Sequence, residues 1–255
     1  MRKLSAAIIF FLAAGAAQAD WTIVSAQTET STSGLQHRHV LLENSETGDR
    51  ATIELAIFSS KLATLRVLDQ PSEPRADLAE LMQREHCLAG TNGGYFDPGY
   101  APLGLRIVDG KIIVPLQRSR LLTGVLSAGT RGIQIARLGE FSRRPKLNAA
   151  VECGPFLVDL GVRVIGLEAT RSARRTFAAV TKSDRAALGY CSEASLAELS
   201  QILTLPLADE FTIWRALNLD GGSSSAFWFK RKEGGAVSIP EQKTVRDFIA
   251  VVPKS

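Results

Sequence analysis

The sequence predicts an α+β fold in a single domain, with a mixed, largely antiparallel β-sheet core and a few flanking helices. Many short runs rich in β-branched and aromatic residues are separated by polar turn residues, which is typical of strands. Few segments carry apolar residues at helical spacing. The chain has 255 residues, of which 45% are apolar, as expected for an ordinary globular core.

The first nineteen residues predict a secretory signal peptide and are set aside from the fold. Two basic residues open the segment, an apolar run covers residues 4–17, and Ala-Gln-Ala at 17–19 is a small-x-small cleavage site. The run is short for a membrane span, and no later segment reaches about 18 apolar residues. We therefore expect an exported protein, periplasmic or secreted and without a stable membrane anchor, whose mature domain spans residues 20–255.

The first half of that domain predicts strands, one helix and one hairpin. Predicted strands cover residues 40–42, 51–58 and 64–68. Three apolar residues at helical spacing predict an amphipathic helix over residues 75–85. Asp109-Gly110 between two apolar runs predicts a two-residue hairpin turn within residues 103–114, because both central residues of such a turn take positive φ.

The second half continues in the same way. Predicted strands cover residues 121–127, 133–138, 156–159, 176–181, 187–190 and 245–252. A helix is predicted from Ser192 or Ser195 to Leu203, and Glu198 would complete a capping box with Ser195. A second short helix is predicted over residues 207–214.

Charge and cysteine content restrict the function classes. Without residues 1–19 the chain keeps 28 basic and 26 acidic residues, so nothing predicts binding to nucleic acid. Cys87, Cys153 and Cys191 leave at least one thiol unpaired, and the sequence does not choose among the three pairs. None lies in a CxxC motif or a Cys/His cluster, so we favour buried thiols or one disulfide over a zinc site or a catalytic cysteine.

Two glycine-rich segments carry most of the candidate site residues. They read TNGGYFDPGYAPLG over residues 91–104 and ALNLDGGSSSAF over residues 216–227. Adjacent glycines let a ligand approach the backbone closely, although tight turns, or an N-cap role for Asp220, would explain the same letters. The candidates are Asn92, Gly93, Gly94, Tyr95, Phe96 and Asp97 from the first segment, and Asn218, Asp220, Gly221, Gly222 and Ser223 from the second.

Two further segments add an acid and three polar or basic side chains. VECGPFL over residues 151–157 contains Glu152 and the turn residue Gly154. RSARRT over residues 171–176 contributes Arg174, Arg175 and Thr176. The arginine fork matches phosphate or carboxylate oxygens, whereas a solvated basic loop is the structural alternative.

In this order the four segments resemble the phosphodiester glycosidase family. The resemblance also includes Gly104, Asp109-Gly110 and the closing VRDFIAVV, where Arg246 falls at a position that the family tends to fill with arginine, and it spans residues 88–252. It implies a hydrolase that cleaves a sugar-1-phosphodiester in envelope or extracellular glycans, with a phosphate-bearing glycan as its partner. The family often has a histidine and a proline before its arginine-threonine pair, where this chain has Ala173-Arg174.

The residues and the resemblance together suggest roles. A phosphate monoester is a stable leaving group, so one carboxylate suffices where ordinary glycosidases need two. Asp220 would act as nucleophile or as base for water, with Glu152 or Asp97 as a second acid. Arg175, with Arg174 or Arg246, would hold the phosphate. The glycine pairs would offer backbone donors, Tyr95 or Phe96 would pack on the sugar, and hydroxyls would be bound by Asn92, Asn218, Thr176 and Ser223.

Two other functions stay open from the sequence. The same residues could bind an anionic polysaccharide without cleaving it, or Ser223 or Ser224 could serve a serine hydrolase if the fold brought His86 across. His37 and His39 would share one strand face, and we expect them to be solvated. Carboxylates in the motifs suit Ca²⁺ or Mg²⁺, but no loop has EF-hand spacing, so we predict no metal and no other cofactor.

Overall fold

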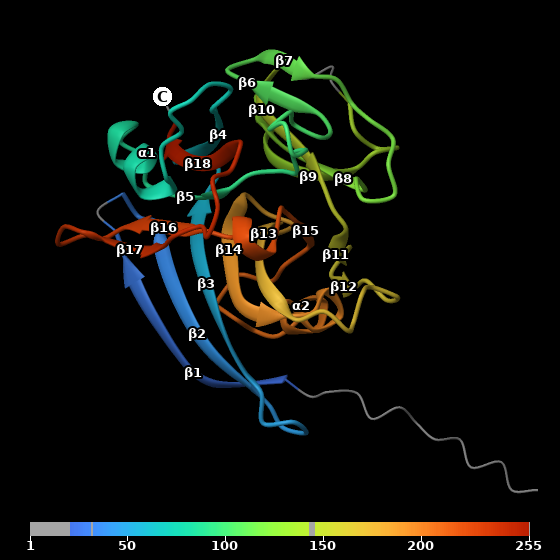
Figure 1. The fold of residues 1–255 in the computed structure, drawn as a ribbon. Coiled ribbons are helices and arrows are strands. Elements are labelled where there is room, and N and C mark those ends of the chain that lie inside the picture. Colours follow the sequence, from blue (N-terminus) through green and yellow to red (C-terminus); the bar gives the residue numbers. More distant parts are fainter. Residues whose placement is uncertain (1–20, 32, 143–145, 255) are drawn as a thin grey trace, which may run out of the picture.

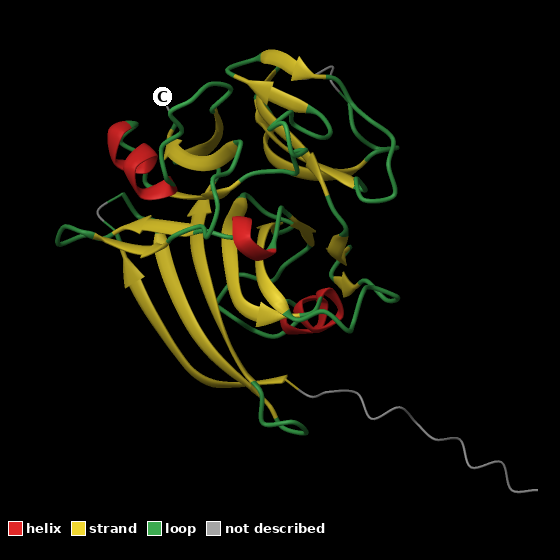
Figure 2. Cartoon of the chain, in the orientation of Figure 1, coloured by secondary structure: helices red, strands yellow, loops and turns green. Residues whose placement is uncertain are grey.

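Strands dominate the computed structural model, which describes residues 21–31, 33–142 and 146–254. Every strand pairing among these residues is antiparallel, and the strands form three sheets (Figures 1 and 2). The eight-stranded sheet has the order β1 (Trp21–Thr30), β2 (Gln36–Asn44), β3 (Arg50–Ser59), β14 (Arg185–Ala194), β13 (Ala173–Val180), β15 (Arg215–Asn218), β11 (Phe156–Asp159) and β12 (Val162–Arg163).

Two five-stranded sheets complete the architecture. The first has the order β7 (Lys111–Val114), β6 (Arg106–Val108), β10 (Leu147–Cys153), β8 (Gly124–Gly129) and β9 (Gly132–Arg137). The second has the order β17 (Ala236–Ile239), β16 (Phe227–Lys230), β5 (Ala89–Asn92), β18 (Asp247–Pro253) and β4 (Ala63–Asp69). In Figure 1 the strands β1, β2 and β3 are long and bowed, and both smaller sheets lie beyond one end of them.

The three sheets share one apolar core. Phe58 of β3, Leu126 of β8 and Ile249 of β18 belong to the same buried cluster, so each sheet turns one face toward the others. Side chains of this kind each stabilise the fold by roughly 1.5–3 kcal/mol when fully buried. The opposite face of the eight-stranded sheet is covered by α2 (Leu196–Ile202), whose Leu199 and Ile202 are fully enclosed.

The helices are few and short. The helix α1 (Leu78–Arg84) is capped by the Asp77 side chain, which accepts from the N–H of Glu80, and it packs on the sheet that contains β18. The predicted capping box of α2 is confirmed, since the Ser195 hydroxyl and the Glu198 carboxylate exchange hydrogen bonds with each other's backbone N–H. With two seven-residue α-helices among the residues that the structure describes, the fold is more β-rich than the mixed α+β class that the sequence predicted.

Local turn chemistry explains why the predicted hairpin is confirmed and why one predicted helix is wrong. Asp109 and Gly110 both take positive φ, 47° and 81°, and join β6 to β7 as the hairpin prediction required. The helix predicted over residues 207–214 is wrong. Glu210 lies in the left-handed region with φ 54°, which ends any helix, and the buried Phe211 and Ile213 pack under the large sheet instead.

Gly189 faces the ring of Phe177 across β13 and β14, and this contact predicts a measurable stability effect. A Cβ on Gly189 would lie 2.2 Å from the Phe177 Cζ atom, so Gly189→Ala must displace a fully buried ring. We expect a loss of about 1–3 kcal/mol in the free energy of unfolding, measured by urea denaturation. Gly139→Ala is the control, because a Cβ there meets nothing within 4 Å; equal losses in both variants would contradict the prediction.

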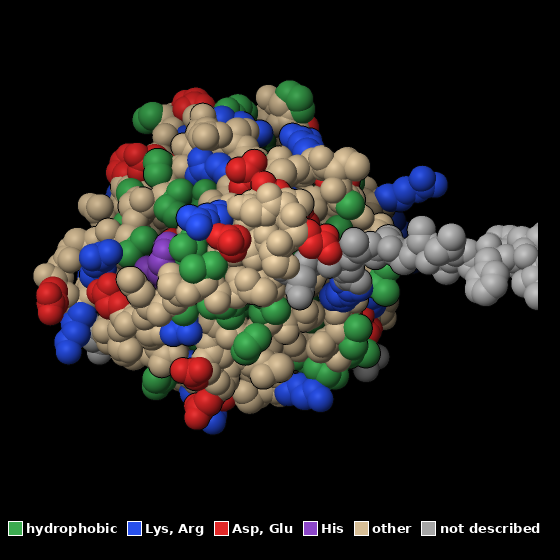
Figure 3. Space-filling model, turned by 90° about the horizontal axis from the view of Figure 1, so that it is seen from below, with side chains coloured by type: hydrophobic (Ala, Val, Ile, Leu, Met, Phe, Trp, Pro, Cys, Tyr) green, Lys and Arg blue, Asp and Glu red, His purple; other side chains and the backbone are tan. Residues whose placement is uncertain are grey.

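The helices in the described part of the chain are short. None of its helices has the length and hydropathy needed to cross a bilayer. The predicted signal peptide, residues 1–19, lies outside the described residues. On the face seen in Figure 3, acidic, basic and apolar side chains are interspersed, and neither charge sign forms a continuous patch there.

Candidate functional site

The main chain of Asp220 joins three of the four predicted segments. Asp220 follows β15, whose neighbour β13 contains Thr176, and Asn92 ends β5. The Asp220 carbonyl oxygen accepts from Asn92 Nδ2 at 2.6 Å and from Thr176 Oγ1 at 2.8 Å, and the Asp220 N–H donates to the Gly93 carbonyl at 3.2 Å. Two side chains from distant parts of the sequence therefore hold the aspartate in place.

The Asp220 carboxyl group lies in a mostly buried position. Burial raises its pKa above the ordinary aspartate value, while the Ser224 hydroxyl, the Lys243 ammonium and the Gly221 N–H favour the ionised form, and the charge of Asp247 opposes it. Gly221, and not Asp220, is the N-cap of the short 3₁₀ helix η1 (Gly222–Ser224), which no side chain caps. The N-cap alternative for Asp220 is therefore wrong.

Tyr95, Asn218 and Gly154 form a hydrogen-bonded cluster beside Asp220. The Tyr95 hydroxyl donates to the Gly154 carbonyl at 2.6 Å, and Asn218 Nδ2 reaches the Tyr95 oxygen at 3.1 Å and the Gly154 carbonyl at 3.0 Å. Burial raises the pKa of Tyr95, the Asp220 charge raises it further, and Arg175 lowers it. The remaining predicted segment, VECGPFL, thus reaches the same site through Gly154.

Arg175 lies against the backbone of the DGGSSS segment. A Cβ on Gly221 would lie 3.6 Å from both the Cδ and the Nη1 of Arg175. Arg175 Nε donates to the Ala194 carbonyl at 3.0 Å and Nη2 to the Arg171 carbonyl at 2.7 Å, while Nη1 has no hydrogen-bond partner among the described residues. Burial lowers the pKa of this guanidinium, although it stays far above neutral pH, and Glu168 at 3.8 Å partly compensates.

Arg174 supports the same segment from the other side. Its Nη2 donates to the carbonyls of Ser225 at 2.6 Å and Pro240 at 2.7 Å, which ties the loop before β18 to the DGGSSS segment. The Ser223 carbonyl accepts from the Gln242 N–H at 2.8 Å in the same contact. Three buried polar atoms around this segment lack partners among the described residues: Arg174 Nε, Asn218 Oδ1 and Ser225 Oγ. Such unpaired atoms are costly in a folded protein and are common at functional sites.

Several predicted residues have other contacts. Phe96 stacks on Tyr100 with ring centroids 5.3 Å apart, and the Asp97 carboxylate accepts from the Ala101 N–H within a turn. Arg246 forms a bidentate ion pair with Asp69, at 2.6 and 3.0 Å, and donates to a backbone carbonyl. Each of these side chains therefore has a partner other than the Asp220 carboxyl group.

The pair Gly93–Gly94 accommodates a buried ion pair that the sequence analysis missed. Arg106 Nε lies 2.9 Å from Asp247 Oδ2, and both side chains are almost completely buried. A Cβ on Gly93 would lie 1.7 Å from Asp247 Oδ1, and one on Gly94 would lie 2.0 Å from Arg106 Nη2. The close approach that these glycines allow is therefore to the ion pair. Arginine inside the apolar run LGLRIV, and aspartate beside Arg246, were the available signals.

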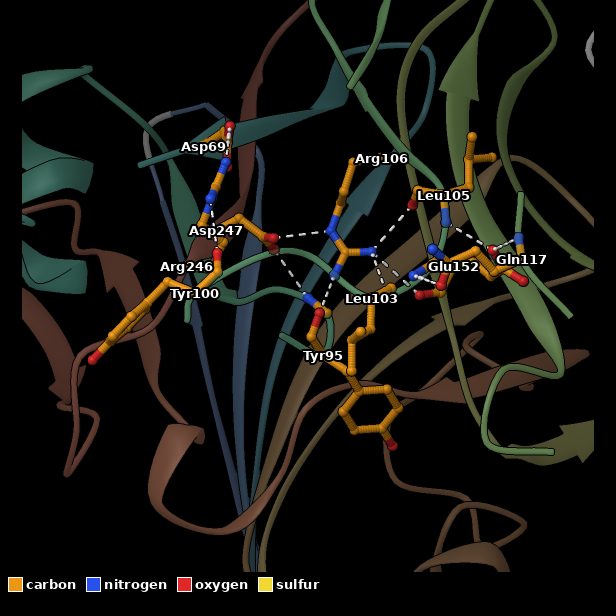
Figure 4. Close-up of polar contacts among 12 residues, drawn as sticks. Asp69, Tyr95, Tyr100, Leu103, Leu105, Arg106, Gln117, Glu152, Arg246 and Asp247 are labelled. Carbon is orange, nitrogen blue, oxygen red and sulfur yellow. Dashed lines mark hydrogen bonds and ion pairs between the residues drawn. The ribbon is translucent and has the colours of Figure 1, made fainter. Parts of the chain in front are cut away.

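Glu152 is fully buried, on the side of Arg106 opposite Asp247 (Figure 4). Its Oε2 accepts from the N–H groups of Leu105 at 2.7 Å and Gln117 at 3.0 Å, and its Oε1 has no partner among the described residues. Arg106 also donates to the Tyr95 carbonyl at 3.0 Å, and the Tyr95 ring points away from the guanidinium toward Asn218. With no exposed surface, Glu152 has no direct route to a substrate in this conformation.

Lys243 was also missed by the sequence analysis. It is exposed, its ammonium lies 5.2 Å from the centre of the Phe96 ring, and its charge acts on Asp220. The only sequence signal was its position two residues before the closing VRDFIAVV. Lys243 acts on the Asp220 carboxyl group and Arg175 lies against the neighbouring Gly221, so the site has two cations.

The cysteines and histidines do not form a nucleophilic site. All three cysteines are free and buried, and burial raises the pKa of Cys87 to about 11 and of Cys153 and Cys191 to about 12, so they are thiols at neutral pH. His37 and His39 are not simply solvated, since each lies 2.7 Å from a different oxygen of the buried Glu54 carboxylate.

Serine and metal chemistry find no further support in the described residues. Over residues 21–31, 33–142 and 146–254, no histidine is hydrogen-bonded to Ser223 or Ser224. Within the same ranges, no group of three histidine, cysteine or acidic side chains could hold a metal ion.

A cavity of 480 Å³ lies away from Asp220. It is lined by Trp214 and Arg215 at the start of β15, whereas Asp220 follows the end of that strand.

Comparison with known proteins identifies similar folds. The family model for phosphodiester glycosidases matches residues 85–252. The chain is similar to the catalytic domain of zebrafish N-acetylglucosamine-1-phosphodiester alpha-N-acetylglucosaminidase, auto-inhibited by its pro-peptide, with a TM-score of 0.59 and 16% identity over 92% of this chain and 82% of that one. No curated protein matches the sequence.

Two bacterial structures are similar in the same way. A hypothetical protein from Synechocystis has a TM-score of 0.63 and 15% identity, over 90% of this chain and 64% of that one. A protein from Burkholderia pseudomallei K96243 that is described as exported has a TM-score of 0.57 and 13% identity, over 82% and 75%. At these identities the likeness shows the fold.

Proposed function

The chain belongs to the phosphodiester glycosidase family, and from this premise we propose that it is an exported hydrolase that cleaves a sugar-1-phosphodiester in envelope or extracellular glycans. One observation carries the proposal. Four segments spread over more than a hundred residues converge on Asp220, which Asn92 and Thr176 fix through its carbonyl while Arg175 lies against the next residue. The exported setting rests on the signal-peptide prediction and agrees with the description of the Burkholderia relative.

The proposed reaction breaks the bond between the anomeric carbon and the bridging phosphate oxygen. Water supplies the hydroxyl group of the released sugar, and the phosphate monoester leaves with the bonding electron pair. This leaving group is already a stable anion, so the site needs charge stabilisation more than a strong acid. That requirement fits one carboxyl group on Asp220 beside the cations of Arg175 and Lys243.

Asp220 acts as the nucleophile or as the base that activates water. Its raised pKa makes the carboxylate a stronger base than an exposed aspartate, provided that the pH is high enough to ionise it. The stereochemical course separates the two roles, because a nucleophile gives net retention and a base gives inversion at the anomeric carbon. Proton NMR of the first product anomer measures this directly.

The phosphate lies between the two cations in our proposal. Arg175 Nη1 is free to donate, whereas the guanidinium of Arg174 is partly occupied by carbonyls and that of Arg246 is held by Asp69. Lys243, which is exposed and acts on Asp220, supplies the second charge. Tyr95 and the unpaired buried hydroxyl of Ser225 would meet the sugar or phosphate oxygens.

Hydrolysis of synthetic sugar-1-phosphodiesters tests the function, beginning with an N-acetylglucosamine compound because the zebrafish relative is named for it. We expect release of free sugar, and we expect Arg175→Gln to lower kcat/KM by about 10²–10³-fold because one donor to the developing charge is lost. Arg171→Gln is the matched control, since that side chain is exposed, hydrogen-bonds Arg175 only through its carbonyl and otherwise acts on it only through its charge.

Two outcomes would count against this assignment. Tight binding of phosphodiesters without any sugar release would favour the polysaccharide-binding alternative. Equal loss of activity in the Arg175 and Arg171 variants, with both proteins folded by circular dichroism, would separate Arg175 from the phosphate. Activity on a glycoside without phosphate should be insensitive to either substitution.

A further inference from the structure

A loop beside the candidate site carries exposed apolar and basic side chains together. Leu103, Leu116 and Leu121 are 38%, 39% and 64% exposed. Arg118 and Arg120 lie between the last two leucines and are exposed as well. We call these five residues the basic–apolar rim. Single exposed leucines are normal on a protein surface, but a cluster with a defined position beside a site marks an interaction surface.

The rim is held in place by the buried network of Figure 4. The Gln117 N–H donates to Glu152 Oε2 at 3.0 Å, and Gln117 Oε1 accepts from the Gly104 N–H at 2.9 Å. Gln117 thus ties residues 115–121 to the segment around Leu103. This anchoring gives the fully buried Glu152 carboxylate a structural use: it fixes the base of an exposed loop.

The same loop borders the site. The Leu103 N–H donates to the Tyr95 carbonyl at 2.8 Å, and a Cβ on Gly154 would lie 2.6 Å from the Leu121 carbonyl oxygen. Tyr95 and Gly154 in turn form the hydrogen-bonded cluster with Asn218, which lies two residues before Asp220. The rim therefore lies on the side of the site formed by Tyr95 and Gly154.

The charge of this region is one-sided. Between residues 110 and 123 the sequence has three basic residues and no acidic one, although the chain as a whole is close to neutral. In the part of the chain that the structure describes, Arg118 and Arg120 form no ion pair. Unpaired arginines between exposed leucines fit an anionic lipid surface, where headgroups pair with the cations and apolar tips enter the acyl boundary.

We propose that the basic–apolar rim docks the protein on a membrane surface that contains anionic phospholipid. Docking there would bring the side of the Asp220 site formed by Tyr95 and Gly154 close to the lipid. A substrate presented on that surface would then reach the site without leaving it. The proposal goes beyond the proposed hydrolysis and does not depend on it, because it concerns where the protein binds.

The experiment is co-sedimentation of the chain from Asp20 onward with phosphatidylcholine vesicles, with and without phosphatidylglycerol. We expect binding only to the vesicles that contain phosphatidylglycerol, and weaker binding at high salt. The double variant Arg118→Gln/Arg120→Gln should weaken partitioning about 25-fold, at about fivefold for each arginine near an anionic surface. Lys230→Gln/Lys232→Gln removes the same charge from exposed positions at the end of β16 and just after it, and should change binding far less.

Leucine variants provide a second, independent comparison. Leu121→Ser should weaken vesicle binding, whereas Ile165→Ser, at an even more exposed position outside the rim, should not. Absence of binding to anionic vesicles, or equal losses in rim and control variants, would overturn the proposal. So would a rim that instead joins two copies of the chain, seen as a dimer that the double variant dissociates. Binding measured on Asp220→Asn keeps this result separate from any failure of catalysis.

Discussion

Asp220→Asn is expected to lower kcat/KM on a sugar-1-phosphodiester by about 10³-fold or more, while the protein becomes more stable at neutral pH. The loss follows because the amide can neither attack the anomeric carbon nor take a proton from water, and such steps contribute about 10²–10⁴-fold. The carbonyl that Asn92 and Thr176 hold belongs to the main chain, so the local backbone should survive the substitution.

The gain in stability follows from the direction of the pKa shift. Burial raises the pKa of Asp220, so the folded state binds the proton more tightly than the unfolded state does. Stability associated with this group is therefore present below the ordinary aspartate pKa of 3.8 and is lost as the pH rises through the folded value. At neutral pH the ionised carboxylate destabilises the fold, and asparagine removes that penalty.

Thermal unfolding at pH 5 and pH 8, together with steady-state kinetics, checks both halves of the prediction. For the parent protein, kcat/KM should decrease as the pH is lowered, and the midpoint of this decrease should lie above pH 3.8. Asp209→Asn is the control, because Asp209 is exposed on another loop and should change neither quantity. If the Asp220 variant is folded and keeps its turnover, Asp220 has no part in the chemistry.

The resemblance located the candidate site better than residue patterns alone could. Asn92, Arg175 and Asp220 lie far apart in the sequence, and only the ordered motifs indicated that they meet. Local rules worked where the cause was local, as in the Asp109-Gly110 turn and the Ser195 cap. Such rules depend on a few neighbouring residues, so the sequence contains all that they need.

Features that depend on distant contacts were missed. The helix predicted over residues 207–214 failed because Phe211 is drawn into the core beneath the large sheet, and tertiary burial overrides a weak local preference. Arg246 was chosen as a phosphate ligand, yet its partner is Asp69, which is distant in the sequence. Glu152 was chosen as a candidate second acid because the sequence alone does not show that its side chain is fully buried.

The ion pair of Arg106 and Asp247 carries the largest stability effect that we expect. Asp247→Asn should lower the free energy of unfolding by about 3–5 kcal/mol, because it leaves the Arg106 charge buried without compensation. Asparagine keeps the shape of the side chain and an acceptor for the Gly94 N–H, so the loss reports the charge rather than a cavity. Urea denaturation of the purified variants measures the change.

An exposed pair provides the matched comparison. Glu43→Gln breaks the ion pair with Arg50, whose side chain is 66% exposed, and should cost less than about 1 kcal/mol. Similar costs for Asp247→Asn and Glu43→Gln would contradict the prediction that burial makes the difference.

A double-mutant cycle tests whether the two buried charges act on each other. Arg106→Met alone leaves the buried Asp247 carboxyl group without its partner, whereas Arg106→Met/Asp247→Asn removes both members of the pair, so the double variant should cost less than the two single losses added together. Additive losses would mean that Arg106 stabilises the fold through the carbonyls of Leu103, Leu105 and Tyr95 and not through Asp247. A coupled pair would instead join β6 to β18 and hold Tyr95 at the site, which ties the stability of this core to the geometry around Asp220.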